Sequence, residues 1–138
     1  MDGPVYNSRG IKIHRVSFMR ALLVVAHGSR RAESNEEVRQ LTDQIRGQNP
    51  TAFAFIACAF LELAEPSIPA GLQTCADAGA SEIVVVPYFL SAGRHVVEDI
   101  PAEIAQFTHT APDVQVKLVP HLGTADLLPG IMLGLANN

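Results

Sequence analysis

Two histidines are the residues of this sequence best suited to chemistry, because each follows a short apolar run and stands close to glycine and arginine. His27 begins the segment His-Gly-Ser-Arg-Arg, and His95 ends the segment Ser-Ala-Gly-Arg-His. A third segment, Phe-Leu-Glu-Leu-Ala-Glu-Pro-Ser, also follows an apolar run and carries Glu62. Two neutral imidazoles and a carboxylate suit a borderline divalent ion such as Co²⁺, Fe²⁺, Ni²⁺ or Zn²⁺ and leave coordination positions open. An imidazole also accepts protons at neutral pH, so the three residues predict a metal site that can move protons.

Four apolar runs are expected to form the strands that position these side chains. They cover residues 20–26, 52–59, 82–88 and 114–119. The first three are apolar almost without interruption, which is typical of strands buried on both faces, and the fourth alternates as an edge strand would. Helical patterns separate the runs. The resulting βαβαβαβα order predicts an α/β fold, with a parallel sheet, right-handed crossovers and helices on both faces.

The helical patterns carry their own start and stop signals. In the first, Ser34 and Glu37 have the spacing of a capping box, which predicts the start of a helix. In the second, Pro66 is expected to open the helix and Gly79 to close it. Pro101 lies near the first turn of the third. The apolar residues that share one face in the four patterns are Val38, Leu41 and Ile45; Ile68, Leu72 and Cys75; Ile100, Ile104 and Phe107; and Leu127, Leu128, Ile131 and Leu135.

The predicted topology brings the chemistry to one edge of the sheet. Ligands of open parallel sheets bind beyond the carboxyl ends of the strands. His27, Glu62 and His95 each follow one of the first three strands, so they are expected at the same edge despite their separation in sequence. His121 follows the fourth strand and is also expected near this edge, with its role left open.

Each of these residues also has a purely structural interpretation. A histidine at a strand end can simply be hydrogen-bonded, and Glu62 can be a solvated loop acid. Glu65 can stabilise the start of the following helix through the helix dipole. Arg30, Arg31 and Arg94 can form a solvated rim, although three arginines at this edge of an acidic protein would also bind substrate carboxylates. The two histidines favour a functional site because they occur together, at matching strand ends.

Length and composition fit one domain and give no support to a nucleic-acid or membrane role. The chain has 138 residues and a net charge of −4, and no apolar run approaches the roughly 20 residues of a membrane span. It has neither of the glycine-rich loops that cradle nucleotide phosphates. Cys58 and Cys75 occupy apolar positions and are expected to be buried thiols of a cytoplasmic protein without disulfides. Residues 1–18 lack periodicity and are expected to form an extension outside a domain of residues 19–138.

Three motifs, in order along the chain, resemble those of the short class II chelatases, the sirohydrochlorin chelatases of cobalamin and sirohaem synthesis. They are VVAHGSR at 24–30, FLELAEPSI at 60–68 and VVPYFLSAGRHVVEDIP at 85–101. The resemblance extends over nearly the whole chain apart from the first residues. It implies a single chelatase-like (Rossmann-like) domain with a four-stranded parallel sheet, and it implies a homodimer.

The same resemblance implies roles for the site residues. His27, His95 and Glu62 would ligate the metal, with His27 also the proton acceptor and Glu62 an acidic catalytic residue. The tetrapyrrole would contact Glu65, Phe89, Leu90, Ser91, Ala92, Gly93 and Arg94. Arg30 is a further candidate for contact with the substrate, because of its charge. Five apolar side chains near the site would be exposed in a monomer, as expected of a ligand or partner surface: Phe60, Leu61, Leu63, Phe89 and Leu90.

The expected function is therefore the insertion of a divalent metal into sirohydrochlorin without a nucleotide cofactor. Two pyrrole N–H protons leave as the metal enters, so the reaction needs both a metal ligand and a base. Co²⁺ is favoured over Fe²⁺ and Ni²⁺ by the frequency of cobalt in the family and by no residue of this chain. Two other functions stay open: a metal or tetrapyrrole carrier that does not catalyse, and a structural partner domain whose histidines are satisfied internally.

Overall fold

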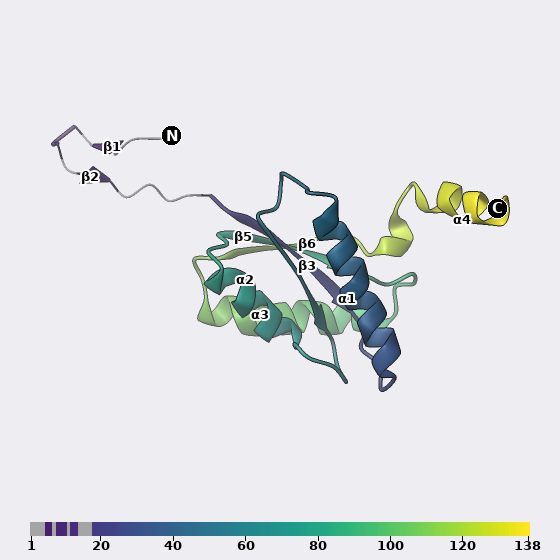
Figure 1. Ribbon diagram of the computed structural model, residues 1–138. Helices are drawn as coiled ribbons and strands as arrows, with labels where there is room; N and C mark the ends of the chain where they lie inside the picture. Colours follow the sequence, from purple (N-terminus) through teal and green to yellow (C-terminus); the bar gives the residue numbers. More distant parts are fainter. Residues whose placement is uncertain (1–4, 7, 11, 14–17) are drawn as a thin grey trace.

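Strand β3 (Arg20–Ala26) lies in the middle of a four-stranded sheet on which the rest of the domain is built (Figure 1). The computed structural model describes residues 5–6, 8–10, 12–13 and 18–138. The strand order is β4-β3-β5-β6, and every pairing is parallel. The other three strands are β4 (Phe55–Phe60), β5 (Glu82–Pro87) and β6 (Gln115–Leu118). The predicted parallel sheet is confirmed, and each strand lies within its predicted run or ends one residue beyond it.

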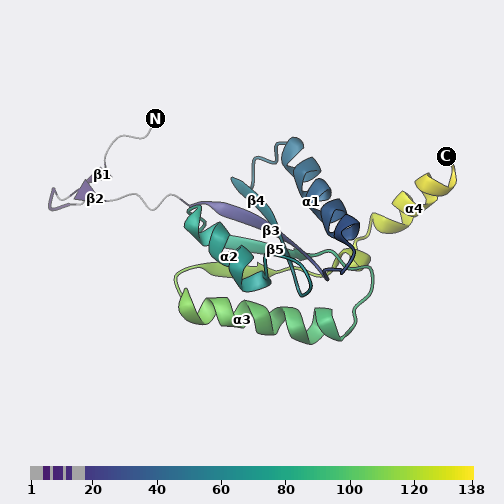
Figure 2. The same cartoon turned by 60° about the horizontal axis from the view of Figure 1, so that its bottom comes forward.

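Helices cover both faces of the sheet, as predicted. Helix α1 (Ala32–Gly47) lies on one face, and α2 (Ile68–Asp77) and α3 (Ile100–Thr110) lie on the other (Figure 2). Because side chains alternate along a strand, Leu23 of β3 faces α2 and α3, and Val24 faces α1. Both are buried, so β3 is covered on its two faces, as its uninterrupted apolar sequence predicted. The core on the α2 side also includes Val25, Ile68, Leu72, Cys75, Ile83, Val85, Ile100 and Phe107.

The helix starts differ from two of the predictions. Helix α1 begins at Ala32 and its N-cap residue makes no side-chain hydrogen bond, so the predicted capping box is wrong and Ser34 lies inside the helix. Helix α2 is not opened by Pro66. Ser67 is its N-cap, and the Ser67 hydroxyl accepts a hydrogen bond from the Ala70 N–H at 3.2 Å. A serine at this position satisfies an amide that the helix itself leaves without a partner.

Other predicted boundaries are confirmed. Gly79 follows the end of α2 with a φ of 109°, a conformation that favours glycine. A proline lies in the first turn of α3, which is preceded by one turn of π-helix, His95–Asp99. A short 3₁₀ turn, Leu122–Thr124, leads to the last helix, α4 (Leu128–Ala136).

The two cysteines differ in burial. Cys75 lies in the core, where burial raises the pKa of its thiol to about 11, so the thiol is neutral at physiological pH. Cys58 is half-buried on the edge strand β4. Neither forms a disulfide. The prediction of buried thiols is therefore correct for Cys75 and only partly correct for Cys58.

The central strands are tied together at the end of the sheet opposite to the predicted site. Arg20 and Glu82 are partners in the pairing of β3 with β5, and Arg20 Nε donates a hydrogen bond to Glu82 Oε2 at 3.2 Å. The Arg20 guanidinium also lies 4.8 Å from the centre of the Phe53 ring, just before β4. These contacts link the starts of three neighbouring strands.

Two further segments take no part in the main sheet. Helix α4 extends away from the sheet (Figures 1 and 2), and its apolar face is exposed, with Ile131, Met132 and Leu135 each more than half exposed. In the region expected to be an extension, the two-residue strands β1 (Val5–Tyr6) and β2 (Lys12–Ile13) pair with each other and not with the main sheet. Within the described residues, no helix has the length and apolar character needed to cross a bilayer.

The capping assignments can be tested by comparing two serines. Ser67→Ala should lower the free energy of unfolding by about 1 kcal/mol, because the Ala70 amide loses its partner. Ser34→Ala should change it by less than about 0.5 kcal/mol, because Ser34 caps no helix. Urea unfolding followed by circular dichroism measures both values. Equal losses in the two variants would contradict the assignment.

Candidate functional site

His27 and Glu62 meet at the carboxyl edge of the sheet, as predicted. His27 Nε2 lies 2.9 Å from Glu62 Oε1, a hydrogen-bond distance. Both side chains are accessible, with exposed fractions of 41% and 51%. The Phe89 ring lies beside the imidazole, with ring centres 6.2 Å apart and a tilt of 43°. The pair is therefore positioned by strand ends that are far apart in sequence, and it remains open to a ligand.

Backbone hydrogen bonds beyond the strand ends hold this pair together. The Leu61 N–H donates to the Ala26 carbonyl at 2.9 Å, and the Glu62 N–H donates to the His27 carbonyl at 3.0 Å. Backbone hydrogen bonds between the two segments thus continue past the last paired residues, Ala26 and Phe60. They bring the segments together where the His27 and Glu62 side chains meet.

Gly28 allows the two segments to approach this closely. Its φ is +92°, which L side chains rarely adopt, and a Cβ atom at this position would lie 1.7 Å from the Glu62 carbonyl oxygen. A residue with a side chain would therefore be strained in its backbone and would also collide with the neighbouring segment. The His-Gly sequence is a geometric requirement of the His27–Glu62 contact.

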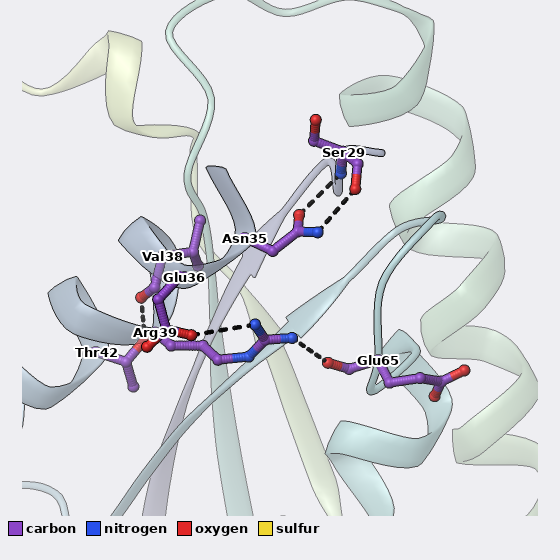
Figure 3. Close-up of polar contacts among 7 residues, drawn as sticks. All are labelled: Ser29, Asn35, Glu36, Val38, Arg39, Thr42 and Glu65. Carbon is purple, nitrogen blue, oxygen red and sulfur yellow. Dashed lines mark hydrogen bonds and ion pairs between the residues drawn. The ribbon is translucent and has the colours of Figure 1, made fainter. Parts of the chain in front are cut away.

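Asn35 is a buried polar residue of this region that the sequence analysis missed. Its side-chain carbonyl accepts a hydrogen bond from the Ser29 N–H at 2.9 Å, and its amide donates to the Ser29 carbonyl at 2.7 Å (Figure 3). A signal was present in the sequence. Asn35 lies three residues before Val38 on the same face of the helix, and an asparagine on an inward helical face needs a partner.

Two small hollows flank the pair. One, of about 240 Å³, is lined by His27, Gly28, Ser29 and Tyr88 together with residues of α1. The other, of about 190 Å³, is lined by Leu61, Glu62, Asp99, Ala102 and Glu103. A larger hollow of about 460 Å³ surrounds Phe53 at the opposite end of the sheet and contains neither histidine nor Glu62. The His27–Glu62 pair therefore lies beside two small hollows and apart from this larger one.

His95 lies on the same side of the sheet by its backbone, but its side chain is outside what the structure describes. Its backbone begins the π-helical turn that follows the loop after β5. Among the described side chains, no group of three or more His, Cys, Asp or Glu residues is arranged to hold a metal ion. Metal ligation by His27, Glu62 and His95 thus stays a prediction.

The segment expected to line a tetrapyrrole forms an exposed loop after β5. Phe89 is half-buried against the core, whereas Leu90 is 69% exposed, and Ser91, Ala92 and Gly93 are exposed. Arg94 is also exposed, with its Nε 3.7 Å from Glu98 Oε2. The 3₁₀ turn after β6 supports this loop, because the Gly123 N–H donates to the Phe89 carbonyl at 3.0 Å. His121 caps that turn by its position and is half-buried.

One residue of the predicted apolar surface, Phe60, is not exposed. Phe60 is fully buried, because it is the last residue of β4, pairs with Ala26 and lies under the Arg39 guanidinium, 5.2 Å from the ring centre. Leu61 is half-buried, and Leu63 is 53% exposed. The exposed apolar surface near the site is therefore smaller than predicted.

Glu65 and Arg30 are exposed near this edge. The Glu65 carbonyl accepts a hydrogen bond from Arg39 Nη2 at 3.1 Å, and the Glu65 carboxylate points away from Arg39 (Figure 3). Arg39 also pairs with Glu36 at 3.4 Å. Both Glu65 and Arg30 are thus accessible to a ligand.

Residues 21–135 match the sequence profile of the CbiX family. The chain belongs to the CbiX family. This membership agrees with the resemblance to sirohydrochlorin chelatases, and the matched residues include the sheet, the His27–Glu62 pair and the loop after β5.

Individual relatives agree with the family assignment. The sirohydrochlorin ferrochelatase of Arabidopsis thaliana chloroplasts is 32% identical over 88% of this chain and 53% of its own length. The sirohydrochlorin cobaltochelatase of Methanococcus maripaludis is 36% identical over 60% of this chain and 56% of its own length. The crystal structure of the sirohydrochlorin chelatase SirB from Bacillus subtilis subspecies spizizenii in complex with cobalt is 27% identical, with a TM-score of 0.76 over 87% of this chain and 51% of that one. The matched residues span about half the length of each of these relatives.

Gly28 offers a direct test of the site geometry. Gly28→Ala should lower the free energy of unfolding by about 2 kcal/mol, because the backbone conformation and the Glu62 carbonyl both oppose a side chain. Gly47→Ala is the matched control, because a Cβ at Gly47 meets nothing within 4 Å and the position has no positive φ; it should cost nothing. Urea unfolding measures both. A Gly28→Ala variant as stable as the unmodified protein would refute the close approach.

Proposed function

We propose that this CbiX-family protein inserts a divalent metal into sirohydrochlorin. The observation that carries the proposal is the His27–Glu62 pair, an accessible imidazole and carboxylate 2.9 Å apart at the carboxyl edge of the sheet. The names of the relatives support the substrate, since they are sirohydrochlorin chelatases for iron or for cobalt.

The distance between the two side chains suits a metal as a shared ligand. Nitrogen and oxygen ligands lie about 2.1 Å from a divalent ion of this kind. Two atoms 2.9 Å apart can both reach that distance with an angle of roughly 90° at the ion, close to the right angle of octahedral coordination. In our proposal the incoming metal replaces the proton between His27 and Glu62, which passes to water at this accessible site, and His95 supplies a further ligand.

The same residues would then receive protons from the tetrapyrrole. Insertion of M²⁺ releases two pyrrole protons, so the charge of the complex is conserved when both leave. Once the metal moves into the ring, the His27 imidazole is free to accept one of these protons. Glu62, at hydrogen-bond distance, stabilises the resulting imidazolium. Water removes the second proton from the open site.

The surroundings of the pair fit a broad anionic ligand. In our proposal the exposed Arg30 and Arg94 bind the carboxylates of the tetrapyrrole. Glu65 and the loop from Phe89 to Gly93 flank the ring in this arrangement, with Phe89 and Leu90 offering apolar contacts. No nucleotide is required by this chemistry.

The test follows the visible spectrum of sirohydrochlorin with Co²⁺ and then with Fe²⁺ and Ni²⁺. The protein should accelerate insertion above the uncatalysed rate, and we expect Co²⁺ to be inserted fastest. The Arabidopsis relative makes Fe²⁺ the alternative. A protein that binds the metal or the tetrapyrrole without accelerating insertion would be a carrier, and the proposed function would be wrong.

His27 should be essential for this activity. His27→Ala should reduce the insertion rate at least about 100-fold, because it removes both a metal ligand and a proton acceptor. The fold should be unchanged, since the side chain is 41% exposed. His109→Ala is the control, because His109 is exposed near the end of α3 and should leave the rate unaltered. An undiminished rate in His27→Ala would end the proposal.

We also propose that the protein acts as a homodimer. The match covers 51% of the Bacillus subtilis SirB chain, so a second copy of this chain would supply a domain corresponding to the remaining half. The exposed Leu63 and Leu90 beside the site offer apolar surface to such a partner. Light scattering should give twice the 14.8 kDa of the chain, and a monomer at assay concentrations would contradict the dimer.

A further inference from the structure

Asn35, near the start of α1, makes two side-chain hydrogen bonds to one residue outside the helix. It is only 8% exposed, and both ends of its side-chain amide bind the same residue, Ser29, which lies outside the helix. The amide therefore does not cap α1. It joins the helix to the segment that carries His27, and in doing so it satisfies the donor and the acceptor of a buried group.

We infer that Asn35 is a positioning residue that holds the His27 segment against Glu62. The His27 carbonyl is held on one side by the Glu62 N–H, and Ser29 is held on the other side by Asn35. Gly28 lies between these two anchors with a φ of +92°. A glycine has more backbone freedom than other residues, so two anchors are needed to keep the imidazole in one place. The catalytic part of this inference rests on the proposed function.

Thr42 provides a matched control on the same helix. It is 1% exposed, and its hydroxyl donates to the Val38 carbonyl at 2.8 Å, within α1 itself (Figure 3). Thr42→Val therefore removes a buried polar group and a hydrogen bond from α1 without touching the His27 segment. Any general effect of disturbing the buried face of α1 should appear in this variant too.

The experiment compares Asn35→Ala, Asn35→Asp and Thr42→Val. At neutral pH an aspartate can still accept from the Ser29 N–H but cannot donate to the Ser29 carbonyl, so it keeps half of the contact. Steady-state insertion of Co²⁺ gives kcat and KM for sirohydrochlorin. Amide hydrogen exchange of Glu62 reports on the His27 carbonyl to which it is bonded, and exchange of Val85 reports on the core.

Asn35→Ala should lower kcat by about 10-fold to 100-fold with little change in KM, because the base is misplaced while the substrate surface remains. Glu62 exchange should accelerate about 10-fold while Val85 exchange stays constant, as expected of a local loosening. Asn35→Asp should lie between Asn35→Ala and the unmodified protein. Thr42→Val should resemble the unmodified protein in kcat and in Glu62 exchange.

Three outcomes would overturn the inference. The first is an unchanged kcat in Asn35→Ala, and the second is an equal loss of kcat in Thr42→Val. The third is a parallel acceleration of Glu62 and Val85 exchange, which would indicate a role in overall stability alone. If the unmodified protein does not insert metal, the proposed function fails separately. Exchange of Glu62 then decides the inference: local acceleration in Asn35→Ala supports positioning, and unchanged exchange refutes it.

Discussion

The candidate site depends on backbone hydrogen bonds between the β3 and β4 segments that continue past the ends of both strands. The bond from the Glu62 N–H to the His27 carbonyl is one of them. A side chain on a free loop would occupy many positions, and the entropy of ordering it would be paid on every binding event. Here the sheet has already ordered both residues. The geometry of the pair thus depends on backbone hydrogen bonds next to those that hold the sheet together.

The His27–Gly28 segment and the Glu62 segment are in contact, so neither can move or gain atoms without disturbing the other. Gly28 leaves no space for a Cβ atom beside the Glu62 carbonyl. On the other side, helix α1 contributes Asn35 to the Ser29 backbone. The sheet and the helix therefore meet at the His27 segment, and each restricts it independently. The side chains of His27 and Glu62 nevertheless stay accessible, as the proposed insertion of a metal requires.

Much of the fold and part of the site could be predicted from the sequence. Uninterrupted apolar runs define buried parallel strands, and parallel strands bring their carboxyl ends to one edge, so the meeting of His27 with Glu62 follows from topology. Asn35 was missed because only the apolar members of the α1 pattern were considered. The exposure of Phe60 was wrong because β4 extends one residue further than its predicted run, which places Phe60 in the sheet under Arg39. Contacts of this kind depend on tertiary packing, which a local pattern does not contain.

The contact between Arg20 and Glu82 has a consequence for the opposite end of the sheet. The two residues are paired at the starts of β3 and β5, about 20 Å from the strand ends at a rise of about 3.3 Å per residue. A slip of one residue between these strands would displace the loop after β5 by that rise and would turn each side chain of the moved strand to the other face. A functional constellation tolerates errors of only about 0.5 Å. Arg20 and Glu82 therefore help to fix the register of β3 with β5, and the positions of the residues at the His27 edge depend partly on a contact at the opposite end of the sheet.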